Sequence, residues 1–117
     1  MTIQKVFDLT KEDGKFQYHF SNFAHVFLDT FDKSMVAEEP ENVLQPLLPH
    51  LIYAAAFIHY WCDVALIGVP EWCLKEIYKF EEPVWEGGQY SEYVEALTPK
   101  QLIYHNIYRR AFSLLVV

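Results

Sequence analysis

The chain has 117 residues, a formal net charge of -7 and a pI near 5.1. This acidic balance argues against direct binding of nucleic acid, because contacts with phosphates need clustered lysine and arginine. The length predicts a single domain over residues 1–117, and two cysteines are too few for a secreted disulfide framework. We therefore expect a cytoplasmic protein with reduced thiols.

Two short N-terminal segments alternate apolar and polar residues, which is typical of strands. They cover residues 2–9 and 15–20, and the turn-forming run Lys11-Glu-Asp-Gly14 lies between them. The pattern predicts a short β-hairpin. An irregular arm is the alternative, because an isolated two-stranded hairpin is only marginally stable.

Apolar residues then recur at spacings of three and four, which predicts a helix capped by Ser21 and reaching about Met35. The polar run from Glu38 to Asn42 contains Pro40 and predicts a loop, since the residue before a proline is pushed out of the helical region.

The most apolar stretch, residues 51–62, predicts the centre of the fold, because a helix that is apolar on every side must be surrounded by other elements or by lipid. Its fully apolar part is about half of the roughly 20 residues that a membrane span needs, so we expect no membrane insertion. With prolines in its first turn, this helix is expected over about residues 49–68. The expected fold class is mainly α, a compact helical bundle around this helix.

Beyond it, Pro70 predicts the start of a short helix to about Tyr78, and residues 81–89 read as a loop. The run Thr98-Pro-Lys-Gln101 is a strong helix start, with a threonine cap and a proline at the first position. We expect this last helix to run nearly to the C-terminus.

The best chemical grouping is His59 with Cys62 and Asp63, since side chains three and four apart share one face of a helix. One helix offers too few ligands for a metal ion. We therefore interpret His59, Asp63 and Arg109 as structural buried polar groups, in which Asp63 pairs with Arg109 or Arg110 and His59 bonds a backbone carbonyl or a tyrosine. No metal or cofactor is expected. A small enzyme or metal-binding protein with a site around His59 and Asp63 is the alternative.

The loop that follows combines aromatic and acidic residues, and we interpret Glu82, Trp85, Glu86 and Tyr90 as a partner-binding surface. A large apolar side chain flanked by carboxylates provides an anchor together with charges that attract a basic protein. The alternative is that Trp85 packs into the core of its own chain.

The C-terminal half resembles small helical prokaryotic proteins of the toxin–antitoxin or mobile-element kind. The resemblance rests on the succession Trp61-Cys-Asp63, Pro70-Glu-Trp72, Glu82-Pro-Val-Trp85, Thr98-Pro99 and Asn106-Ile-Tyr-Arg109. It implies a non-enzymatic protein that binds and restrains another protein, as an antitoxin-like or phage anti-defence inhibitor. The expected partner is a protein such as a basic toxin or nuclease. Formation of a homodimer is a further possibility.

Overall fold

The structure is mainly α-helical, as the sequence predicts. This computed structural model describes residues 1–110. Its α-helices are α1 (Ile3–Asp13), α2 (Phe16–Thr30), α3 (Leu48–Val64), α4 (Glu92–Leu97) and α5 (Lys100–Tyr104). Short 3₁₀ helices are η1 (Lys33–Met35), η2 (Gln45–Leu47), η3 (Glu71–Leu74), η4 (Glu76–Tyr78) and η5 (Glu86–Gly88). Two short strands, β1 (Val84–Trp85) and β2 (Ile107–Tyr108), pair in parallel.

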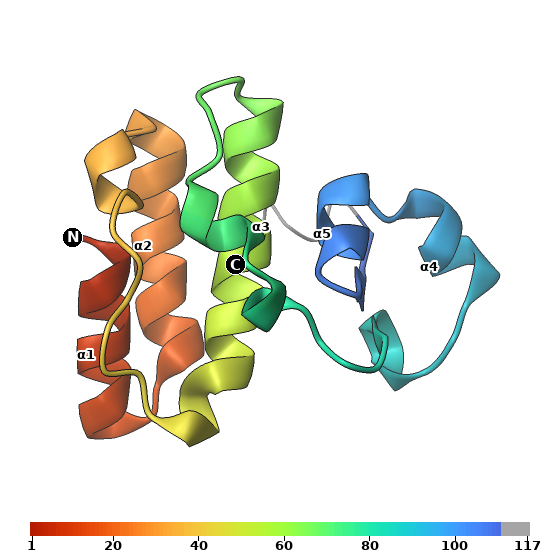
Figure 1. The fold of residues 1–117 in the computed structure, drawn as a ribbon, viewed down its shortest axis with the longest axis horizontal. Coiled ribbons are helices and arrows are strands. Elements are labelled where there is room, and N and C mark those ends of the chain that lie inside the picture. The colour runs from red at the N-terminus through yellow and green to blue at the C-terminus, as the bar shows by residue number, and fades with distance from the viewer. Residues whose placement is uncertain (111–117) are drawn as a thin grey trace.

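The three longest helices lie side by side, and the C-terminal elements lie beyond α3, on the side away from α1 (Figure 1). The chain descends in α1, ascends in α2 and ascends again in α3, so α2 and α3 run in the same direction (Figure 1). Residues 31–47, which connect these two helices, therefore return along the bundle on the side of α1 and α2 (Figure 1), where Gln4 of α1 bonds the backbone of Glu41. Within the described part of the chain, no helix is both long and apolar enough to cross a membrane.

Aromatic side chains fill the space between α2 and α3. Phe23 and Phe27 are fully buried, and Phe20 and Trp61 are 2% and 3% exposed. The Phe20 ring stacks on Trp61 with 5.8 Å between ring centroids, and Phe23 stacks on Phe27 at the same distance. Because burying one such ring contributes about 2 kcal/mol, this aromatic core contributes substantially to the stability of the bundle.

The predicted N-terminal hairpin is wrong, because both of its segments are helical. In α1 the buried residues Ile3, Val6, Phe7 and Thr10 follow a helical spacing that the two-residue alternation hid. Gly14 ends α1 with a φ of 72°, a left-handed conformation that glycine adopts without strain.

The helix predicted from Ser21 begins earlier, at Phe16, and Ser21 lies inside it. Asp13 explains the early start, since its carboxylate accepts a 2.8 Å hydrogen bond from the amide of Lys15. The C-terminal end of α3 also differs from the prediction, because the helix ends at Val64 instead of near residue 68. The chain leaves the helix there because Leu66 adopts a left-handed φ of 59°.

The last helix is also much shorter than the prediction. It ends at Tyr104, and Asn106 takes a left-handed φ of 65°. The threonine cap does not form, because the hydroxyl of Thr98 donates to the carbonyl of Val94 in α4. Pairing of β2 with β1 outweighs the local helix signal. The rest of the predicted helix, residues 111–117, lies outside the described residues.

Candidate functional site

Trp85, the aromatic centre of the predicted partner surface, packs largely against its own chain. Strand β1 places its indole on the ring of Tyr108 from β2, with 4.2 Å between centroids and an 18° angle between planes. Tyr90 meets the same indole edge-on at 5.0 Å. Trp85 is half-buried as a result, so it supports the loop more than it projects from it.

Glu86 is likewise engaged within the chain. Its carboxylate accepts hydrogen bonds from the backbone amide and the guanidinium of Arg110. These bonds stabilise the charged carboxylate and hold the pKa of Glu86 below its usual value. Glu86 therefore joins the loop to the end of β2.

The other two predicted contact residues are exposed and belong to a larger surface. Glu82 is exposed, and Tyr90 is 60% exposed. Residues 81–97 contain five glutamates and no lysine or arginine, and we call this range the acidic segment. It includes α4, which Figure 1 shows at the end of the molecule opposite α1.

Helix α4 displays further apolar side chains in this acidic surrounding. Ser91 caps the helix by accepting a hydrogen bond from the amide of Val94, and Val94 is the buried residue of α4. Tyr93 and Leu97 are 63% and 44% exposed. The sequence prediction did not include Tyr93 in the partner surface. The acidic composition of residues 81–97 could have extended the predicted surface to this residue.

His59 is joined to a buried histidine that the sequence prediction did not connect with it. The Nδ1 atom of His59 lies 2.9 Å from Nε2 of His105, and Nδ1 of His105 lies 2.6 Å from the carbonyl oxygen of Tyr78. A carbonyl only accepts, so His105 donates from Nδ1 and its Nε2 accepts from His59. Burial lowers the pKa of His105 to about 4 and also lowers the pKa of His59, which keeps both rings neutral at pH 7.

Asp63 and Arg109 contact other groups than the sequence analysis expects. The carboxylate of Asp63 accepts a 2.6 Å hydrogen bond from the side-chain amide of Gln101 in α5. The guanidinium carbon of Arg109 lies 5.3 Å from the centroid of the Phe57 ring. Both side chains are half-buried. Together with His59 they join α3 to the C-terminal elements.

Metal and thiol chemistry find little support in the described part. Among residues 1–110, no three histidine, cysteine, aspartate or glutamate side chains are grouped so that they could hold a metal ion. Cys62 and Cys73 are buried free thiols. Burial raises the pKa of Cys62 to about 11 and raises that of Cys73 as well, which disfavours the reactive thiolate.

We compared the chain with known proteins and found no related one. No family model, no curated protein and no solved structure matches the chain.

Proposed function

We propose that this chain is a protein-binding protein that docks on a basic partner through its acidic segment. The observation that carries the proposal is the concentration of charge. Five of the sixteen acidic residues of the chain lie within residues 81–97, a range that contains no lysine or arginine of its own. Of these five, Glu86 is paired with Arg110. Long-range attraction from such a region speeds association with a positively charged surface.

Exposed apolar side chains in the same segment supply the contact area. Tyr90, Tyr93 and Leu97 are between 44% and 63% exposed. Tyrosine is enriched among the few residues that dominate binding energy, because a large, rigid ring is buried at a low entropic cost. In this arrangement Trp85 and Glu86 fix the loop, while the tyrosines and free glutamates make the contacts.

The mode of action proposed for this surface is occlusion. The protein acts as a non-enzymatic inhibitor, antitoxin-like or of the phage anti-defence type, in the cytoplasm of a prokaryotic cell, and covers the working surface of a basic toxin or nuclease. The resemblance of the C-terminal half and the acidic segment support this assignment.

The test is a comparison of charge-reversed baits in a lysate of the organism that encodes the chain. One bait carries Glu92→Lys and Glu95→Lys in α4, and a second carries Tyr93→Ala. We expect one partner rich in lysine and arginine to be retained by the unchanged chain and lost from both baits. With the purified pair, Tyr93→Ala should weaken binding by about thirtyfold, as expected for a central aromatic contact.

The matched control carries Glu12→Lys and Asp29→Lys, which reverse two exposed charges on α1 and α2. It has the same net charge as the first bait, so it should keep the partner. If both double variants lose the partner equally, the loss reflects the net charge of the chain and not the acidic segment. If the α4 variants still retain the partner, the acidic segment is not the contact surface. Melting curves for every bait verify that it is folded.

A further inference from the structure

The turn that follows α3 holds a leucine in a conformation that leucine disfavours. Leu66 has a φ of 59°, and its side chain is 89% exposed. The amide of Ile67 donates to the carbonyl of Cys62 at 3.1 Å. The amide of Leu66 donates to the carbonyl of Asp63 at 3.2 Å, and the two bonds together form a Schellman motif. Glycine usually holds the left-handed position of this motif, so neither the turn nor the core explains a leucine there.

A groove of about 270 Å³ begins two residues beyond this leucine. It lies between residues 33–37 and 68–70, and its lining residues are Lys33, Val36, Ala37, Gly68, Val69 and Pro70. Its floor is fixed, because Nε1 of Trp72 donates to the carbonyl of Val36 at 2.8 Å and Val36 is 2% exposed. Of the described residues that line the groove, Lys33 alone is charged. The groove is therefore preformed and mostly apolar.

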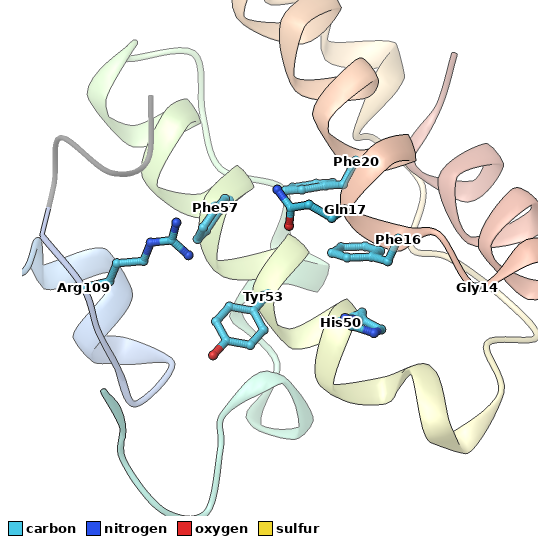
Figure 2. Close-up of a pocket in the computed structure, with 8 residues that line it drawn as sticks. All are labelled: Gly14, Phe16, Gln17, Phe20, His50, Tyr53, Phe57 and Arg109. Atoms are coloured by element: carbon cyan, nitrogen blue, oxygen red, sulfur yellow. The ribbon is translucent and has the colours of Figure 1, made fainter. Parts of the chain in front are cut away.

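The larger cavity between α2 and α3, of about 390 Å³, differs from this groove (Figure 2). Its aromatic rings are already engaged within the chain. Phe16 stacks on His50 with 4.5 Å between ring centroids and on Phe20 at 5.1 Å, and Arg109 lies over the Phe57 ring. The groove beside the turn is thus the better receptor for an added apolar side chain.

A projecting side chain next to a groove is the arrangement that a two-fold dimer uses. A two-fold axis brings the same surface of both copies face to face. Leu66 of each copy then enters the groove of the other copy, so both contacts form at once. Each contact removes an exposed apolar side chain from water, which favours association.

Charge favours the same pairing. The helix dipole places a partial negative charge at the C-terminal end of α3, where the leucine lies. The ammonium of Lys33 lies at the groove, 3.6 Å from where a Cβ atom on Gly68 would stand. In the two-fold arrangement Lys33 of each copy approaches the end of α3 in the other copy. This attraction offsets part of the repulsion between two chains of net charge -7.

We propose that this chain forms a two-fold dimer in which Leu66 of each copy inserts into the groove of the other. An interface of standard size takes about 800 Å² from each copy, and a contact centred on one turn and one groove is smaller. The dimer is therefore weak, with a dissociation constant of about 100 µM. It leaves α4 exposed, because α4 lies on the other side of α3 (Figure 1). One dimer thus presents two acidic segments, and its formation does not depend on the proposed function.

Sedimentation equilibrium of the full chain, from about 10 µM to about 1 mM, measures the dimer directly. Leu66→Gly removes the inserted side chain and supplies the residue that the turn prefers. We expect it to weaken the dimer at least about tenfold without lowering the melting temperature of the dilute monomer. Leu66→Met keeps a long apolar side chain, and its dimer should bind within about threefold of the unchanged chain.

A mixture of two variants tests whether each leucine enters the groove of the other copy. Ala37→Asp puts a carboxylate at the exposed wall of the groove, so it blocks entry but keeps the leucine. Leu66→Gly lacks the leucine but keeps the groove. Neither variant pairs with itself, whereas the mixture restores one of the two contacts. The amide signal of Val69 in isotope-labelled Leu66→Gly, at about 1 mM, should shift when Ala37→Asp is added and not when more Leu66→Gly is added.

The matched control is Leu44→Ala, since this leucine is also exposed, at 48%, but lies outside the groove. It should change the affinity of the dimer less than about twofold. A chain that stays monomeric at about 1 mM would overturn the proposal. So would a dimer that Leu66→Gly leaves intact, or a mixture in which the Val69 signal does not move.

Discussion

The two halves of this molecule are held together in different ways. In the three-helix bundle, residues 3–64, aromatic rings such as Phe23 and Trp61 are buried against one another. In residues 80–110, specific polar contacts recur: Asn106 donates to the carbonyl of Phe80, and Arg110 binds Glu86. Burial tolerates many apolar neighbours, whereas each polar contact needs one particular partner far away in the sequence. We therefore expect the bundle to resist conservative changes and the C-terminal part to depend on single residues.

The largest expected effect is in the aromatic core. Phe23→Ala should lower the free energy of unfolding by about 3–5 kcal/mol, because it removes a fully buried ring and leaves a cavity. Denaturant titration measures the loss. On the same helix, Tyr18 is 63% exposed, and Tyr18→Ala should cost less than about 0.5 kcal/mol. Similar losses for the two variants would show that the core is not packed as described.

Acidification should weaken the contact between the halves. The pKa of His105 is about 4 in the folded chain, and an unfolded histidine has a pKa near 6.5. Between these values the unfolded chain binds more protons, so stability is complete above about pH 6.5 and falls as the pH drops toward 4. This difference amounts to at most about 3 kcal/mol. Denaturant titrations at a series of pH values measure it.

The matched variant is His105→Asn, whose amide nitrogen can still donate to the carbonyl of Tyr78 but does not titrate. It should be less stable at pH 7, because His59 loses its acceptor, and its stability should depend less on pH between 6.5 and 4. Burial also lowers the pKa values of His50 and His59, so a residual slope of the same sign stays in the variant. An unchanged slope would exclude His105 as the main titrating group.

The smallest effect concerns the turn between α1 and α2. Gly14→Ala should cost about 1 kcal/mol, because the φ of 72° is unfavourable for a residue with a Cβ atom. No neighbouring atom lies within 4 Å of the position of that Cβ, so the cost comes from the backbone alone. Asparagine tolerates this conformation, and Gly14→Asn should cost less in thermal melts. A greater loss with asparagine would contradict the backbone explanation.

The sequence predicts correctly those elements whose pattern is local. Its predictions are wrong where contacts between residues distant in the sequence determine the structure. The apolar run of residues 51–62 lies in α3, and the mainly α fold follows from the spacing of apolar residues. The N-terminal segment satisfies two patterns at once, and the helical one is correct because Asp13 and Gly14 stabilise a tight turn. The strong helix start at Thr98 leads to only a short helix because β2 pairs with β1, about 20 residues away, which no local pattern reveals.

The candidate site divides in the same way. Glu82 and Tyr90 are exposed, as a loop of this composition suggests, while Trp85 stacks on Tyr108 and Glu86 binds Arg110. These partners lie on β2 and two residues beyond it, so the residues that anchor the loop could not be separated from those that project from it without the tertiary structure.

The pairing of β1 with β2 also sets the order in which the native state opens. Two-residue strands close a loop of roughly 20 residues, and the entropy of closing that loop opposes the few hydrogen bonds formed. The amide of Val84, which donates to the carbonyl of Asn106, should exchange with deuterium through local opening, long before the amides in the middle of α3. The acidic segment then samples detached conformations while the bundle stays folded, and a partner that binds only the closed form would slow this exchange.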